Sequence, residues 1–180
     1  MTGFGLYGFG EGPFGIGLPK KPRVFVSYHH DQDRDWYDSF TRLFGDAYDL
    51  FTDTSPERRV DSDDADYVRR RIREDNIAGS SSTVVLCGVE TWKRRWVDWE
   101  IQMTLNKEHA LLGIILPTQA QNTYYWPERL LDNLKSGFAH WLYWPQDAKA
   151  LAAAVARAQE LARTTSRIVN SRAAMERSLS

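Results

Sequence analysis

The stretch Thr83-Val84-Val85-Leu86-Cys87-Gly88-Val89-Glu90-Thr91-Trp92-Lys93-Arg94-Arg95-Trp96-Val97-Asp98-Trp99-Glu100-Ile101 decides the fold. Its first five residues are almost continuously apolar, which is typical of a central parallel strand that is covered on both faces. After Gly88, the sequence predicts a helix from about residue 91 to residue 107. Residues three and four apart share one side of a helix, so Glu100 lies on a face with Trp96 and Val97.

A single acid on a mostly apolar helix face has two interpretations. Glu100 is either a boundary residue that reaches solvent or pairs with Arg94 or Arg95, because charged side chains are rarely fully buried unless paired. Alternatively, it is a carboxylate held in a cleft for chemistry. The helix alone does not choose between them.

Short apolar runs flank this stretch on both sides, and segments with helical spacing separate them. We expect the other strands at residues 23–28, 48–51, 110–116 and 138–144. Alternating strands and helices indicate an open parallel sheet covered on both faces. We therefore predict an α/β, flavodoxin-like three-layer fold, with a five-stranded, mainly parallel sheet in the order 2-1-3-4-5.

Sheets of this kind bind ligands beyond the carboxyl ends of their strands, where the strand order reverses. In this chain, that edge carries residues 27–31 after the first strand, 52–54 after the second and 88–92 after the third. The deciding stretch therefore enters its helix at the place where the fold puts binding sites.

The composition excludes several classes of function. The chain has 180 residues, a net charge of −1 and seven tryptophans. This charge gives no general electrostatic case for binding nucleic acid or an anionic membrane. No apolar run approaches the roughly 20 residues that span a bilayer, and the N-terminus lacks the pattern of a signal peptide. We therefore expect a cytoplasmic protein that contacts neither nucleic acid nor membrane.

Residues 1–22 alternate glycine with bulky side chains and differ from the rest of the chain. Glycine loses much backbone entropy on folding, so we expect a flexible Gly/aromatic-rich arm. The alternative is an adhesive arm that docks on a neighbouring subunit of a homo-oligomer. Residues 23–165 form the expected domain, and residues 166–180 are helical by propensity and predict a C-terminal helical extension.

An arginine run marks the helix that precedes the deciding strand. We interpret Arg69, Arg70, Arg71 and Arg73 as a solvated helix face, because acids at the start of a helix and bases later complement its dipole. Val68, Ile72 and Asn76 would then mark the inner side.

Two segments together resemble TIR domains. Val24-Phe25-Val26-Ser27-Tyr28 is similar to their first strand, and Trp96-Val97-Asp98-Trp99-Glu100 is similar to their W-C-x-x-E segment, with Val97 where cysteine is common. The chain resembles more closely the TIR-like proteins of bacterial Thoeris anti-phage defence. Their first strand runs into S-[FY]-H, here Ser27-Tyr28-His29, and their V-x-L-x-G-x-x-T-x-x-R-R-W-V-x-x-E-I pattern is similar to residues 84–101. The resemblance covers about residues 23–116.

The resemblance implies an activity. Enzymatic TIR domains cleave NAD between nicotinamide and ribose, and their key residue is the glutamate that corresponds to Glu100. In Thoeris-type proteins the product is a cyclic or modified ADP-ribose that activates a separate effector protein, and a phage component is the expected trigger. NAD is then a substrate, with no tightly bound cofactor. Other TIR domains catalyse nothing and act as assembly scaffolds, so the fold alone does not settle the function.

The chemistry is reasonable on physical grounds. Departure of nicotinamide leaves positive charge on the ribose, which a nearby carboxylate stabilises as it develops. Nicotinamide leaves as a neutral molecule, so a single acid suffices. Attack by a group of the same molecule makes the enzyme a cyclase, whereas attack by water makes it a hydrolase. Exclusion of water by Trp92, Trp96 and Tyr28 would favour cyclisation.

Further candidate residues surround Glu100. Ser27 and His29 follow the first strand, where they would bind ribose or diphosphate; the alternative for His29 is a helix cap. Asp53 begins the loop after the second strand, where simple turn chemistry is the alternative. Arg95 would bind phosphate or pair with Asp98 or Glu100, and Trp92 would stack on the ligand or pack.

Other kinds of site lack their signatures. The histidines and the single cysteine show no zinc spacing, and the chain has neither a nucleophile elbow nor a phosphate-binding P-loop. Two hypotheses remain: an NAD-consuming enzyme, and a non-catalytic TIR-like assembly module.

Overall fold

A computed structural model describes residues 21–51, 63–119 and 124–179, with side chains for residues 21–50, 70–119 and 124–179. Among them, five strands form one sheet in the order β2-β1-β3-β4-β5. All neighbouring strands run parallel, which confirms the predicted fold class and strand order. The strand bounds are β1 Arg23–Ser27, β2 Asp49–Phe51, β3 Ser82–Cys87, β4 Ala110–Ile115 and β5 His140–Tyr143.

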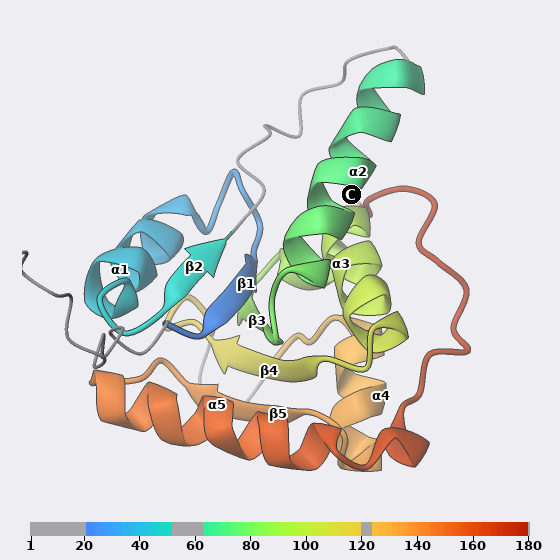
Figure 1. Cartoon of the computed structure of the whole chain (residues 1–180). Coiled ribbons are helices and arrows are strands. Elements are labelled where there is room, and N and C mark those ends of the chain that lie inside the picture. Colours follow the sequence, from blue (N-terminus) through green and yellow to red (C-terminus); the bar gives the residue numbers. More distant parts are fainter. Residues whose placement is uncertain (1–20, 52–62, 120–123, 180) are drawn as a thin grey trace, which may run out of the picture.

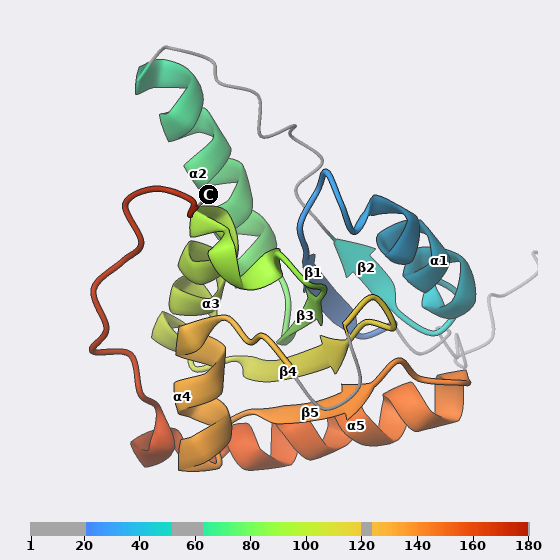
Figure 2. The same cartoon turned by 180° about the vertical axis from the view of Figure 1, so that it is seen from behind.

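Helices cover both faces of the sheet (Figures 1 and 2). Their bounds are α1 Arg34–Phe44, α2 Asp63–Ala78, α3 Arg95–Asn106, α4 Glu128–Ser136 and α5 Ala148–Ala162, with short 3₁₀ turns η1 Thr91–Lys93 and η2 Thr165–Arg167. On one face, α1 and α5 pack through residues such as Phe40 and Leu151. On the other, α3 and α4 pack through residues such as Ile101 and Leu130. These two apolar layers hold the central strands β3 and β4, whose residues are all buried.

A glycine in β4 allows an aromatic side chain to approach the sheet. A Cβ at Gly113 would lie 2.8 Å from the Trp126 ring and 3.1 Å from Leu130. Only hydrogen at this position leaves room for both side chains, so Gly113 fixes how the segment before α4 packs on the sheet.

The inner side of α2 differs from the prediction. Ile72 is 45% exposed, whereas Arg73 and Ile77 are buried. The interpretation of the whole arginine run as a solvated face is therefore wrong for Arg73. Periodicity failed here because the buried position next to α3 holds a charged residue, which the search for apolar spacing passes over.

The C-terminal end of the chain is also different from the prediction. Helix α5 ends at Ala162, and after η2 no further helix forms up to residue 179. Residues 168–179, here called the C-terminal strap, instead run past α4 and along α3 (Figures 1 and 2). The expected helical extension over residues 166–180 is therefore wrong for the described part. Tertiary hydrogen bonds outweigh the modest helix propensity of this segment.

The expected arm over residues 1–22 lies almost wholly outside the described residues, and so does Asp53. Within the described part of the chain, no helix is both long and apolar enough to cross a membrane.

Candidate functional site

The candidate site lies where the strand order reverses, beyond the carboxyl ends of β1 and β3. These strands are neighbours, with Ser27 opposite Val85. The chain leaves β1 through residues 28–33 and leaves β3 through residues 88–94, which brings the two segments together at one edge. This arrangement is the one that the strand order predicts for a ligand site.

A buried hydrogen-bond network joins the two segments. The Thr91 hydroxyl lies 2.8 Å from Asp33 Oδ2, and the Gly88 backbone N–H donates to Thr91 Oγ1 at 2.8 Å. A Cβ at Gly88 would lie 2.2 Å from Asp33 Oδ1, so only glycine fits against this carboxylate. Burial is the main cause that raises the pKa of Asp33, with the Thr91 hydrogen bond opposing it. Asp33 and Thr91 therefore fix the shape of the site.

Asp33 and Thr91 are not among the site residues expected from the sequence. Asp33 stands at the N-cap of α1, but its side chain makes no capping hydrogen bond. Its carboxylate turns to Thr91, 58 residues away. The threonine in the family pattern was the one signal that pointed to this contact.

Ser27, Tyr28 and His29 line the β1 side of the site and are 1%, 1% and 2% exposed. Among the described residues, neither Ser27 Oγ nor the two His29 ring nitrogens have a hydrogen-bond partner. Buried polar groups are normally satisfied, so the lack of a partner at these atoms marks them as candidates for a role in the site. Burial, and then the Arg94 charge, lower the pKa of His29, which favours a neutral ring that both donates and accepts.

Tyr28 is held between two rings. It stacks on His30 with 4.3 Å between ring centroids and on Tyr37 with 4.5 Å. Its hydroxyl makes no hydrogen bond of good geometry, although the Arg34 charge is near enough to favour the phenolate. Burial has the larger effect and raises the pKa of Tyr28 to about 12. The stacking fixes the direction of the Tyr28 ring.

Glu100 is 3% exposed, and its partner comes from another helix. Arg73 Nε on α2 lies 3.1 Å from Glu100 Oε1, and Arg73 is itself 1% exposed. The Arg73 guanidinium also stands over the Trp96 ring, 4.1 Å from its centroid. Glu100 is therefore neither a solvent-reaching boundary residue nor an acid on a bare apolar face. It is a buried carboxylate in a defined ion pair.

Trp96 and Arg95 lie beside this pair. Trp96 is 8% exposed, and Arg95 stands over its ring at 4.7 Å, on a separate contact from Arg73. Asp98, which was considered as a partner of Arg95, pairs instead with Arg129 of α4 at 3.0 Å. A hollow of about 200 Å³ borders Arg95 and Trp96 and reaches the strap. Trp96 therefore connects the two arginines, and Arg95 and Trp96 both border this hollow.

Trp92 has different surroundings. Its indole N–H donates to the Val89 carbonyl at 3.0 Å, and its ring stacks on Tyr125 at 5.9 Å. It lines a hollow of about 260 Å³ together with strap residues Arg172, Ala173 and Met175. The described contacts of Trp92 are thus packing contacts on the strap side of η1, not contacts with Ser27 or His29.

A buried arginine fixes the strap against α3. Arg129 is 0% exposed, and its guanidinium donates to both Asp98 oxygens, at 3.0 and 3.2 Å. It also donates to Asn170 Oδ1 and to the Arg172 and Ala173 carbonyls. Arg129 therefore donates hydrogen bonds to Asp98 of α3 and to the strap at the same time. These hydrogen bonds hold the strap against α3.

The end of the strap reaches the start of α3. The Met175 N–H donates to Asp98 Oδ2 at 3.1 Å, and the Leu179 N–H donates to the Lys93 carbonyl at 2.9 Å. Ser178 Oγ accepts from the Arg95 backbone N–H at 3.2 Å and thereby caps the first turn of α3.

The described part of the chain shows neither a metal site nor a reactive thiol. No group of three or more histidine, cysteine, aspartate or glutamate side chains is arranged there to hold a metal ion. Cys87 is fully buried and burial raises the pKa of its thiol, so it behaves as an inert core residue.

Comparisons with known proteins identify the family. The family model described as "Thoeris protein ThsB, TIR-like domain" matches residues 25–121, which is more than half of the chain. No curated protein matches the chain significantly. Among solved structures, the TIR domains of the activated Roq1 resistosome, which directly recognizes the pathogen effector XopQ, are 14% identical, with a TM-score of 0.40, over 83% of this chain and 86% of that chain. The CMP N-glycosidase BcmB of Clostridium botulinum is 14% identical, with a TM-score of 0.45, over 73% and 96%.

Proposed function

The chain belongs to the family of the Thoeris protein ThsB, TIR-like domain, and from that premise we propose that it is an NAD-consuming enzyme. It cleaves the bond between nicotinamide and ribose and forms a cyclic or modified ADP-ribose. This product activates an effector protein in anti-phage defence, and a phage component triggers the reaction. NAD is a substrate in this proposal, and no tightly bound cofactor takes part.

The buried Glu100–Arg73 pair carries the proposal. A buried ion pair is a poor way to stabilise a fold, because well-packed apolar residues of similar volume are often at least as stable. A buried carboxylate that is held by a guanidinium suits a site where positive charge develops during a reaction. The guanidinium of Arg73, 3.1 Å from Glu100, favours this charged form and fixes the orientation of the carboxylate.

In the proposed reaction, Glu100 stabilises the positive charge that forms on the ribose as nicotinamide departs. The C–N bond breaks with its electron pair going to nicotinamide, which leaves as a neutral molecule. A hydroxyl or ring nitrogen of the same molecule then attacks the ribose carbon and gives the cyclic product, or water attacks and gives free ADP-ribose. One proton is released to solvent in each case, from the attacking hydroxyl or water, or from the base that carries the attacking ring nitrogen.

Ser27 and His29 are the proposed binding groups for the rest of the substrate. Their unpartnered atoms match the hydroxyl groups of ribose, which both donate and accept hydrogen bonds. The proposed contacts for the diphosphate are Arg95 and the neighbouring cation Arg94, whose charge already acts on His29. Tyr28 and Trp96 are proposed to exclude water, which favours cyclisation over hydrolysis.

One observation supports the alternative, a non-catalytic assembly module. Glu100 is already paired with Arg73, and both side chains are almost inaccessible. A purely structural pair between α2 and α3 would look the same. Assembly of identical subunits fits either function, so the oligomeric state does not separate the two.

Product analysis separates them. Purified protein, alone and after incubation with phage lysate, is given NAD, and mass spectrometry follows nicotinamide and the ADP-ribose species. The enzyme forms both products, and the Glu100→Gln variant forms them at least about a hundredfold more slowly. Wild-type protein that leaves NAD intact in every assembly state and with every trigger would instead support the assembly module.

A further inference from the structure

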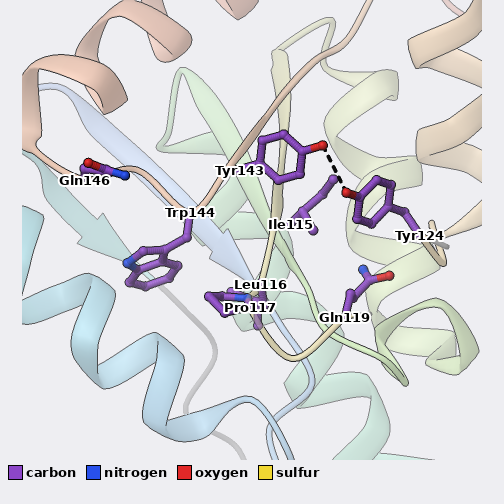
Figure 3. Close-up of a pocket in the computed structure, with 8 residues that line it drawn as sticks. All are labelled: Ile115, Leu116, Pro117, Gln119, Tyr124, Tyr143, Trp144 and Gln146. Atoms are coloured by element: carbon purple, nitrogen blue, oxygen red, sulfur yellow. Dashed lines mark hydrogen bonds between the residues drawn. The ribbon is translucent and has the colours of Figure 1, made fainter. Parts of the chain in front are cut away.

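A cavity of about 630 Å³ lies beyond the carboxyl ends of β4 and β5, away from the Glu100–Arg73 pair. Its volume falls in the range of roughly 300–1,000 Å³ that is typical of small-molecule sites. The residues that line it are Ile115, Leu116, Pro117, Gln119, Tyr124, Tyr143, Trp144 and Gln146. Figure 3 shows the two tyrosines on one side and Trp144 on the other, with Leu116 and Pro117 between them.

The wall of this cavity is aromatic and fixed. The Tyr124 and Tyr143 hydroxyls hydrogen-bond to each other at 3.0 Å, and their rings meet edge to face with 5.8 Å between centroids. Trp144 packs edge to face on Trp36 of α1, at 4.9 Å. Two different parts of the fold therefore hold the aromatic side chains in place before any ligand arrives.

Gln119 closes the wall towards β3. Its amide nitrogen donates to the Cys87 carbonyl at 2.8 Å, and its amide oxygen accepts from the Tyr125 backbone N–H at 2.6 Å. Both the nitrogen and the oxygen of the Gln119 amide therefore have hydrogen-bond partners, which hold the side chain in a fixed position. Gln146 is exposed, so its amide is accessible to a ligand.

Among the described residues, the lining carries no charged side chain. A phosphate or carboxylate would leave water here without gaining an opposite charge, which is unfavourable. A flat neutral ring gains stacking and edge contacts from tyrosine and tryptophan. The tyrosine hydroxyls and the Gln146 amide supply both donors and acceptors, which suits the edge of a heteroaromatic ring.

We propose that this cavity is a second ligand site that binds an uncharged heteroaromatic base, of the kind found in nucleosides, with any attached phosphate remaining outside. The site goes beyond the proposed function, because Glu100 lies between α2 and α3 and does not line the cavity. Its ligand therefore binds whether or not the protein cleaves NAD.

Calorimetric titration of the full chain with adenosine, nicotinamide and ribose 5-phosphate tests the proposal. At least one of the two heteroaromatic probes binds saturably, whereas ribose 5-phosphate, which has no ring of this kind, does not. Tyr143 is 55% exposed, so Tyr143→Ala is compatible with folding. It weakens binding of the probe about tenfold, in line with the loss of one stacking partner.

Matched variants locate the binding. Tyr143→Phe keeps the aromatic ring and stays within about threefold of the wild type, because only the hydroxyl contact is lost. Leu43→Ala, a remote exposed change on α1, and Glu100→Gln both keep full binding. Absence of saturable binding by both heteroaromatic probes overturns the proposal. Binding that survives Tyr143→Ala but fails in Glu100→Gln also overturns it, since the probe then occupies the Glu100 site.

Discussion

Arg73 on α2 and Glu100 on α3 form a buried ion pair with 3.1 Å between Nε and Oε1. The two helices belong to different βα units, so this contact ties the proposed catalytic carboxylate to the helix that follows the loop after β2. The Trp96 ring lies 4.1 Å from the same guanidinium. Arg73 therefore contributes to the packing, charge and orientation of Glu100.

Removal of Arg73 is expected to destabilise the protein strongly. Arg73→Ala leaves the Glu100 carboxylate buried without this partner, which costs about 3–5 kcal/mol. The double variant Arg73→Ala/Glu100→Gln removes both charges and loses less than the sum of the single variants Arg73→Ala and Glu100→Gln. Urea unfolding of the four proteins measures these free energies. A loss of under about 1 kcal/mol in Arg73→Ala would show that the pair is not the main restraint on Glu100.

Substitution of Gly88 by any larger residue is expected to lower the stability of the protein. A Cβ would lie 2.2 Å from Asp33 Oδ1, so Gly88→Ala displaces the carboxylate from Thr91 and costs about 1–3 kcal/mol. Asp33→Ala removes the atoms that the new methyl group meets. Gly88→Ala is therefore less costly in the Asp33→Ala background, which thermal unfolding of both pairs checks. Equal costs in the two backgrounds would contradict the proposed clash.

The free energy of unfolding is expected to fall as the pH drops below the ordinary histidine pKa of 6.5. Burial is the main cause that lowers the pKa of His29, His109 and His140 in the folded protein. Between 6.5 and the lowered values, the unfolded chain binds protons that the folded protein does not, so stability rises with pH in this window. Urea unfolding at pH 7.5, 6.5 and 5.5 measures it. His29→Asn flattens the dependence, and an unchanged slope in that variant would exclude His29 as a contributor.

The strap is expected to be protected from hydrogen exchange. The Val169, Met175 and Leu179 amides donate to Asn133 Oδ1, Asp98 Oδ2 and the Lys93 carbonyl. Asn170→Ala removes an acceptor of Arg129 and speeds exchange of these amides about tenfold. Arg172→Ala, which loses only pairs with Glu128 and Asp132 at the surface, serves as the control with little change. Rapid exchange of the three amides in the wild type would show that the strap does not stay on α3.

The sheet order was predictable because each strand carries its own local signal. Apolar runs such as residues 83–87 and 110–116 alternate with helical spacing, and parallel sheets allow few connections between them. The position of Glu100 at the site edge followed from the same order. Helical spacing alone also predicted that Glu100 and Trp96 lie on the same face of their helix.

The partner of Glu100 was not predictable from spacing. Arg94 and Arg95 were the expected partners because they are near Glu100 in the sequence. The observed partner, Arg73, is brought to Glu100 by the packing of α2 on α3. The same limit applies to Asp33, whose carboxylate accepts a hydrogen bond from Thr91, 58 residues away, instead of capping α1. The prediction of a helix for the strap was wrong because helix propensity depends only on residues that are near in sequence. The hydrogen bonds from Arg129 to the carbonyls of the strap come from a distant part of the chain.

Conversion of NAD by wild-type protein and by Glu100→Gln tests the central proposal most directly. The assay follows nicotinamide and ADP-ribose species by mass spectrometry, with and without phage lysate, and melting temperatures confirm that both proteins are folded. We predict that the wild type releases nicotinamide and forms a cyclic or modified ADP-ribose, and that Glu100→Gln is slower by at least about a hundredfold. A folded Glu100→Gln protein that turns over NAD at the wild-type rate would contradict the role of Glu100.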